Sequence, residues 1–231
     1  TDEEAPNVAD ELMEKVQYYL LSSSCNIASE KGKCPKYDKT KYSKGWLPID
    51  TYKKEIDEFV TRKNSMDWEG LRTRIAEHGL RHSTVSAIMP CESSSVIQCS
   101  TNGIEPIRSY MTYKKSKART LPVIVPNYSS LKNKYTLAYD MEDNTGLIKI
   151  VGALQKWIDM SISANMYYNY EHYENGTLPD SKVIKEILLA YKLGWRTGYY
   201  NNTDDGDKQS FNDGEQKDNI EEGCESGACA L

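Results

Sequence analysis

The amino-acid sequence predicts an α/β fold, and two observations support this prediction. Short segments with the composition of β-strands alternate along the chain with amphipathic helical segments. Apolar residues make up 39% of the 231 positions, which is enough for a sizeable core in one large domain or two small ones. The net charge of −5 argues against a protein that binds nucleic acid through its phosphate backbone, because such a protein needs a basic face.

Targeting signals are not visible in the sequence. No apolar run is long enough to span a bilayer, and the acidic segment 1–6 lacks the apolar stretch of a secretory signal. We therefore expect a cytoplasmic protein that contacts no membrane, with reduced thiols as the default state of its six cysteines.

The first third of the chain is predicted to be mainly helical. Apolar residues recur at helical spacing between Asn7, a candidate N-cap, and Gly32, a candidate stop. After a loop over residues 33–50, two further helices are expected at about 49–63 and 66–78. The stripe on the first helix comprises Leu12, Val16, Tyr19, Leu20, Ser23 and Ile27.

The next segment predicts a strand, a tight loop and a helix in succession. Residues 83–89 are rich in β-forming residues and are bounded by Gly79 and Pro90, which indicates a buried strand. Residues 90–95 then combine proline, acidic and serine residues before the apolar pair at 96–97. These residue types are typical of a helix N-terminus.

The remaining elements follow from periodicity and turn residues. Strands at about 109–114 and 121–125 indicate a hairpin, and a helix is expected at about 129–141. A helix over 147–162 has the clearest apolar stripe, and another, over 180–193, ends at Gly194 before a short strand at 197–201.

The composition changes at about residue 202. Residues 203–219 are acidic and almost without apolar side chains, so they cannot bury enough surface to offset their ordering entropy, and we expect a flexible tether. The tether ends in Cys224 and Cys229, which can reach one another, and a mobile dithiol can reduce a disulfide by thiolate attack. The spacing alone leaves two alternatives open, namely two incidental thiols or a zinc site, although no further ligand lies nearby.

Several segments resemble one known family. Residues 223–229, Gly-Cys-Glu-Ser-Gly-Ala-Cys, resemble the C-terminal signature of the large subunit of class Ia ribonucleotide reductases. Further similar segments follow the order of the family over nearly the whole chain, and together they match the last third of that subunit. They are residues 17–21, 47–54, 89–95, 101–106, 155–159, 161–165, 190–194 and 197–200.

The resemblance implies both a fold and an activity. Residues 1–201 would form the C-terminal part of a ten-stranded α/β barrel, and residues 202–231 would form a flexible tail with a redox-active cysteine pair. The activity would be that of a ribonucleoside-diphosphate reductase. This enzyme reduces ribonucleoside diphosphates to 2′-deoxyribonucleoside diphosphates by a radical mechanism, for the synthesis of DNA precursors.

The resemblance assigns the substrate diphosphate to one loop, formed by Pro90, Cys91, Glu92, Ser93 and Ser94. Unpaired backbone N–H groups at a helix start favour a phosphate, and the serine hydroxyls can add donors. We expect the Glu92 side chain to point away from the phosphate or to form a cap. Cys91 stands where relatives often carry serine or threonine. An ordinary capped helix is the alternative interpretation.

Tyr199 and Tyr200 match the paired tyrosines through which the family transfers a radical. Two rings must be close for this transfer, whereas neighbours in a regular strand point to opposite faces. We therefore predict an irregular backbone that lets the rings stack. Without the resemblance, the pair would be interpreted as a core or interface pair.

The resemblance also gives roles to the cysteines. Cys224 and Cys229 would re-reduce a disulfide formed in the active site at each turnover, and thioredoxin or glutaredoxin would then reduce them. Cys25, Cys34 and Cys99 match no catalytic position, and we expect buried structural thiols.

The expected partners follow from what this sequence does not match. No segment corresponds to the cysteines that start the reaction, so we expect the N-terminal part of the large subunit as a partner, with most of the ATP and dNTP effector sites. The small (beta) subunit would hold a diiron-tyrosyl radical, and this chain is expected to bind no metal or cofactor. A partial barrel would leave open strand edges and an uncovered apolar face, which implies a large interface.

Other origins and functions stay open at this point. The chain would be one half of a naturally split subunit or a truncated form. A non-catalytic remnant or scaffold that binds reductase subunits or thioredoxin is an alternative. A free-standing dithiol oxidoreductase is disfavoured, because the usual C-x-x-C at a helix start is absent.

Overall fold

The computed structural model describes residues 2–91, 93–115 and 120–204. Four helices are long: α1 (Ala5–Lys31), α3 (Trp68–His78), α6 (Thr145–Trp157) and α7 (Asp180–Lys192). Three are short: α2 (Pro48–Thr51), α4 (Ser93–Ile97) and α5 (Tyr128–Leu131). The strands are β1 (Met111–Lys115), β2 (Thr120–Ile124), β3 (Ser163–Asn169) and β4 (Thr197–Asp204). This mixture of helices and strands agrees with the predicted α/β class, and the described strands form two separate two-stranded sheets.

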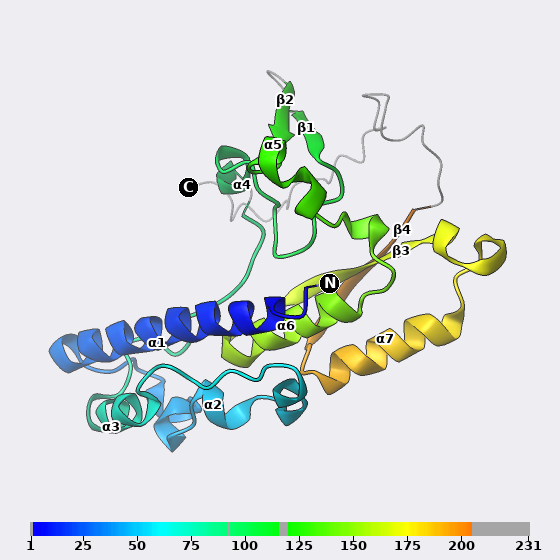
Figure 1. Cartoon of the computed structure of the whole chain (residues 1–231). Coiled ribbons are helices and arrows are strands. Elements are labelled where there is room, and N and C mark those ends of the chain that lie inside the picture. Colours follow the sequence, from blue (N-terminus) through cyan, green and yellow to red (C-terminus); the bar gives the residue numbers. More distant parts are fainter. Residues whose placement is uncertain (1, 92, 116–119, 205–231) are drawn as a thin grey trace.

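Helix α6 lies at the centre of the molecule, beside α1 and in contact with α2 and α7 (Figure 1). Strands β3 and β4 pair in parallel and are connected through α7, as a parallel pair requires a long crossover. The main core lies between α6, α7 and β3, and Gly152 permits the close approach of α6 to the end of α7. A Cβ atom at Gly152 would lie 2.9 Å from the carbonyl oxygen of Leu193.

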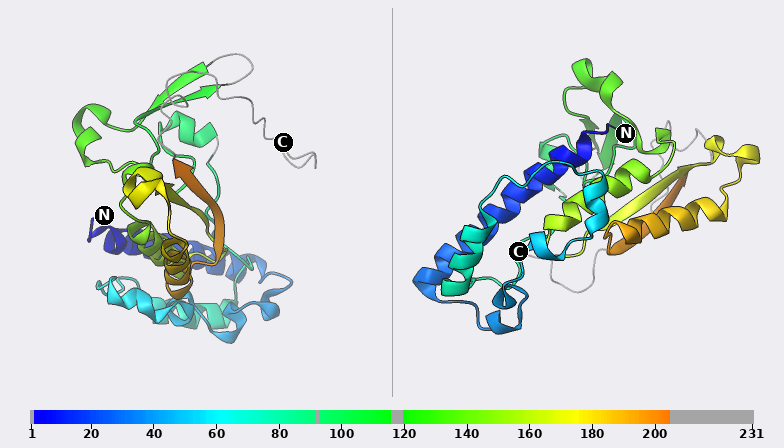
Figure 2. Two further views of the ribbon diagram at one scale, coloured as in Figure 1. Left: turned by 90° about the vertical axis from the view of Figure 1, so that its right-hand side faces the viewer. Right: turned by 60° about the horizontal axis from the view of Figure 1, so that its bottom comes forward.

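Strands β1 and β2 form an antiparallel hairpin that stands apart from the helices α1 and α6 (Figures 1 and 2). Helices α4 and α5 lie on the same side of the molecule as this hairpin (Figure 1). No helix in the described part of the chain is long and apolar enough to cross a membrane.

One face of helix α1 carries polar side chains that are buried, and the opposite face carries apolar side chains that are exposed. The side chains of Asp10, Glu14 and Gln17 are completely buried at helical spacing. The opposite face is exposed to solvent, and we call it the α1 apolar stripe. It consists of Val8, Leu12, Val16, Tyr19 and Leu20.

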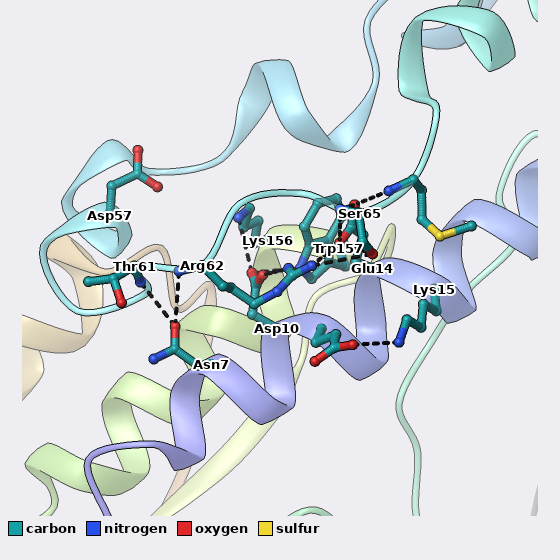
Figure 3. A network of polar contacts seen from close by, with 12 residues as sticks. Asn7, Asp10, Glu14, Lys15, Asp57, Thr61, Arg62, Ser65, Lys156 and Trp157 are labelled. Carbon is teal, nitrogen blue, oxygen red and sulfur yellow. Dashed lines mark hydrogen bonds and ion pairs between the residues drawn. The ribbon is translucent and has the colours of Figure 1, made fainter.

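An ion-pair network explains this orientation of α1 (Figure 3). Arg62, on the loop before α3, forms ion pairs with both Asp10 and Glu14. Asp10 also forms an ion pair with Lys156 at 3.0 Å and accepts a hydrogen bond from the Trp157 indole at 2.8 Å. Buried charges are stable only when they are paired and hydrogen-bonded, as they are here. Glu14 also accepts hydrogen bonds from the backbone N–H and hydroxyl of Ser65, the Met66 N–H and the Trp68 indole.

Several predicted elements are confirmed. Helix α3, the β1–β2 hairpin and helix α7 occupy the predicted segments, whereas strand β4 begins at the predicted Thr197 and continues to Asp204, into the expected tether, because these residues pair with β3. The first helix begins at Ala5 rather than after Asn7, because the Asn7 carboxamide accepts from Thr61 and Arg62 amides instead of capping the helix.

Other predictions were wrong. Residues 83–89 form no strand, because the side chain of Asp159 accepts from the Val85 amide at 2.7 Å where a strand would form a ladder. The helix expected at 49–63 is replaced by α2 and a 3-10 turn, Lys54–Glu58. The chain leaves the helical conformation after this turn because Arg62, in the following loop, forms ion pairs with α1. The helix expected at 129–141 is only α5 and two 3-10 turns, and α6 ends five residues before the expected Ile162. Strand β3 was not predicted.

Candidate functional site

Tyr199 and Tyr200 lie side by side on β4. Their ring centroids are 4.1 Å apart at an interplanar angle of 50°, and both side chains are more than half exposed. The pairing of β3 and β4 is irregular at this point: Ala164 pairs with Gly198, and Met166 with Asn201. Two tyrosines on β4 therefore face one residue on β3, which is the arrangement of a β-bulge. The predicted irregular backbone is confirmed, and the role of the pair in radical transfer stays a prediction.

Asn165 is the β3 residue opposite the two tyrosines. Its Oδ1 accepts a hydrogen bond from the Tyr200 backbone N–H at 2.9 Å. Its Nδ2 donates to both carboxylate oxygens of Glu105, at 2.8 and 2.9 Å. Only the amide nitrogen can donate to a carboxylate, so Glu105 fixes the orientation of the Asn165 side chain.

Glu105 is itself held by further contacts. It accepts from the Asn165 backbone N–H at 2.8 Å and from the Tyr167 hydroxyl. Burial raises the pKa of the Tyr167 phenol to about 12, and the hydrogen bond to Glu105 acts in the same direction. The phenol therefore remains a donor at neutral pH. The Arg108 guanidinium lies 5.4 Å from the centroid of the Tyr167 ring and 3.4 Å from Asn202 Oδ1.

The loop assigned to the diphosphate lies at the start of α4, beside the turn at 101–103. Pro90, Cys91, Ser93 and Ser94 are exposed, and Glu92 lies outside the described residues. The Cys91 N–H donates to the Asn102 carbonyl at 2.8 Å, and the Ser94 N–H donates to the Cys91 carbonyl at 3.0 Å. The predicted helix after this loop is present, and the assignment of the loop to phosphate stays a prediction.

The cysteines differ in their surroundings. Cys224 and Cys229 lie outside the described residues, so their pairing stays a prediction. Cys25 is buried, as expected, and Cys34 is partly buried. The expectation for Cys99 was wrong: it is exposed, because it lies in the turn after α4 with a φ of 52°.

Sequence reasoning missed the supports of the tyrosine pair. Glu105 and Asn165 lie within segments 101–106 and 161–165, which carry the family resemblance. Their place in these segments was the one signal that could have pointed to the two residues, since nothing in the sequence pairs two polar residues sixty positions apart.

Comparison with known proteins finds similarity over the whole chain. The family described as "Ribonucleotide reductase, barrel domain" matches residues 1–133 and 126–201. The chain is 46% identical over 232 residues to ribonucleoside-diphosphate reductase 1 subunit alpha of Salmonella typhimurium, and 45% identical over 235 residues to that of Escherichia coli. It is 38% identical over 206 residues to the subunit alpha of Enterobacteria phage T4, an alignment that covers 88% of this chain and 27% of the relative. The two bacterial alignments cover 100% of this chain, which spans about 30% of the length of those relatives.

Proposed function

Because the chain belongs to the ribonucleotide reductase barrel-domain family, as a C-terminal portion of the class Ia alpha subunit, we propose that it supplies three parts of a ribonucleoside-diphosphate reductase. These parts are a loop for the substrate diphosphate, a tyrosine pair for radical transfer and a reducing tail. The chain would be active only together with the rest of the alpha subunit and a radical-generating beta subunit.

The contact between Tyr199 and Tyr200 is the observation that carries this proposal. A tyrosyl radical on one ring takes an electron and a proton from the phenol of the other, so that one O–H bond forms and one breaks. Such a step requires close rings, and here the centroids are 4.1 Å apart. A pair that packs in the core of this chain would be buried, whereas both of these rings are exposed.

Substrate binding is proposed for the loop at the start of α4. The exposed hydroxyls of Ser93 and Ser94 are suitable donors for a diphosphate. Cys91 offers only a weak thiol donor, and its backbone N–H already donates to the Asn102 carbonyl at 2.8 Å, so we expect the serine hydroxyls to contribute more than Cys91.

The tail is proposed to act as the reductant. A thiolate of Cys224 or Cys229 attacks an active-site disulfide and forms a mixed disulfide, which releases one active-site thiolate. The second tail thiolate then attacks the tail sulfur of this mixed disulfide and releases the other active-site thiolate. The two tail thiols become a disulfide while the active-site disulfide becomes two thiols, so electrons and atoms balance. Thioredoxin or glutaredoxin would supply the next pair of electrons.

The exposed surface supports a partner that covers it. Leu12 and Tyr19 of the α1 apolar stripe are 59% and 60% exposed, which is unusual for neighbours on one helix face. Among the described residues β4 is an edge strand that pairs only with β3, and an edge strand is a place where another segment can add to a sheet. We propose that the rest of the alpha subunit covers the α1 apolar stripe and this edge.

Reconstitution tests the proposed function. The chain is isolated from its source with its copurifying partners, the beta subunit is added, and reduction of a ribonucleoside diphosphate is measured. We expect turnover in the complex, and its loss to background in Tyr199→Phe and in Tyr200→Phe. Tyr113→Phe, which changes another exposed tyrosine, is the matched control.

The outcomes separate the alternatives. Turnover that persists in Tyr199→Phe and Tyr200→Phe would contradict a radical relay through this pair. A complex that assembles without any turnover would favour the scaffold alternative.

A further inference from the structure

The bulge at Tyr199 and Tyr200 creates a structural need. A bulge leaves one residue without a place in the ladder, and the backbone amide of that residue needs another acceptor. The Tyr200 N–H finds this acceptor in Asn165 Oδ1, at 2.9 Å. A side chain of β3 therefore takes the place of a backbone carbonyl where the two tyrosines depart from regular pairing.

The acceptor is fixed in position by a carboxylate from another part of the chain. Glu105 accepts three hydrogen bonds from Asn165, two from Nδ2 and one from the backbone N–H. The Tyr167 hydroxyl donates to the same carboxylate. Asn165 thus cannot rotate its amide without losing bonds to a charged acceptor, and such bonds are stronger than neutral ones.

We propose that Asn165 and Glu105 are positioning residues that hold Tyr199 and Tyr200 in ring contact and thereby set the rate of radical transfer between them. This inference rests on the proposed function of the tyrosine pair. Without the acceptor, β4 gains by returning to regular pairing with β3. Consecutive side chains then alternate between the two faces of the strand, and the rings separate.

The chemistry of the pair also explains why position 165 carries asparagine. Aspartate has nearly the same shape and could still accept from Tyr200, but it would place a second carboxylate against Glu105. Repulsion would then turn the side chain away. Exchanging the two groups, with aspartate at 165 and glutamine at 105, restores an amide facing a carboxylate and keeps an oxygen for the Tyr200 N–H.

The test compares five variants of the full chain, each assembled in the complex with its partners. They are Asn165→Ala, Asn165→Asp, Glu105→Gln, the double exchange Asn165→Asp with Glu105→Gln, and Asn169→Ala. Asn169 is the matched control, because it lies on the same strand and its side chain also accepts from a backbone amide, that of Glu171 at 2.9 Å. Three quantities are measured: kcat, KM for the ribonucleoside diphosphate, and the hydrogen-exchange rate of the Tyr200 amide.

We expect Asn165→Ala and Asn165→Asp to lower kcat by about tenfold or more, since a misplacement of about 1 Å can cost up to about 100-fold. KM should stay unchanged, because the substrate does not contact these residues in the proposed arrangement. The Tyr200 amide should exchange about tenfold faster once its acceptor is lost. The double exchange should recover most of kcat, and Asn169→Ala should match the wild type.

Two results overturn the inference. In the first result, both Asn165 variants keep the wild-type kcat while Tyr199→Phe and Tyr200→Phe abolish turnover. The radical relay would then be supported, and the positioning role of Asn165 would be contradicted. The other result is a loss of kcat that the double exchange does not recover in a chain with the wild-type Tm. If Asn165→Ala lowers Tm, the nearly isosteric Asn165→Asp carries the test. Turnover that survives in the tyrosine variants themselves would instead contradict the proposed function.

Discussion

The buried carboxylate of Glu14 on α1 forms an ion pair with the guanidinium of Arg62, which lies on the loop before α3 (Figure 3). The Glu14 side chain is 0% exposed and that of Arg62 only 14%. The same guanidinium also pairs with the buried Asp10, to which Lys156 forms a second ion pair. This arrangement attaches α1 to the rest of the chain.

Arg62→Met should destabilise the chain strongly. It leaves Glu14 buried without its ion-pair partner and Asp10 with Lys156 alone, and breaking a buried pair costs about 3–5 kcal/mol. Urea unfolding followed by circular dichroism measures the free energy of unfolding. The control is Lys15→Met, which removes the exposed pair with Glu11 and should cost less than about 1 kcal/mol. Equal effects of the two substitutions would contradict the importance of the network.

Stability should also depend on pH through Glu14. Burial alone would raise the pKa of Glu14, but hydrogen bonds from Arg62, Ser65 and Trp68 hold it below the ordinary value of 4.5. A carboxylate with a lowered folded-state pKa contributes stability that is fully present above the ordinary value and is lost as the pH falls through the folded value. We expect the free energy of unfolding to fall as the pH drops below about 4.5, and Glu14→Gln to show a smaller fall. Parallel pH profiles for the two proteins would show that other groups cause the acid loss.

Cys224→Ser should separate the two ways of supplying electrons to the enzyme. The proposed tail dithiol connects thioredoxin to the active site, so thioredoxin-driven turnover should fall to background in the variant. A small dithiol such as dithiothreitol reaches the active-site disulfide directly and should still support some activity. Cys99→Ser, which changes an exposed thiol elsewhere, is the control. Unchanged thioredoxin-driven turnover in Cys224→Ser would exclude the proposed role of the tail.

The residue pattern within a single segment predicted those elements whose ends are set by capping and turn residues in the same segment. The helix expected at 180–193 is α7, Asp180–Lys192, and the expected hairpin is β1–β2. Strand assignment failed where it depends on a neighbour. Residues 83–89 have strand composition but bond to the Asp159 side chain, whereas β3 contains two asparagines and still forms a strand because β4 pairs with it.

The buried face of α1 shows a second limit of sequence reasoning. Helical periodicity predicts the helix, and an apolar stripe normally faces the core. Here Asp10 and Glu14 face the interior because their partners, Arg62 and Lys156, come from distant segments. The tyrosine pair also depends on a distant segment. Its irregular backbone was expected from the motif, but its contact with the Asn165 side chain can be recognised only when β3 and β4 are paired.

The α1 apolar stripe gives the last prediction, which concerns assembly. Leu12 is 59% exposed in this chain, so Leu12→Asp removes little burial and should change the free energy of unfolding by no more than about 0.5 kcal/mol. If the rest of the alpha subunit covers the stripe, the same substitution places a charge in an apolar interface. Burying a leucine side chain contributes about 1.5–3 kcal/mol, so Kd for that partner should rise by at least about tenfold. Ser29→Asp introduces the same charge on α1 outside the stripe and is the matched control. Isothermal titration calorimetry with the copurifying partner measures both Kd values, and an unchanged Kd for Leu12→Asp would place the interface on another face of the chain.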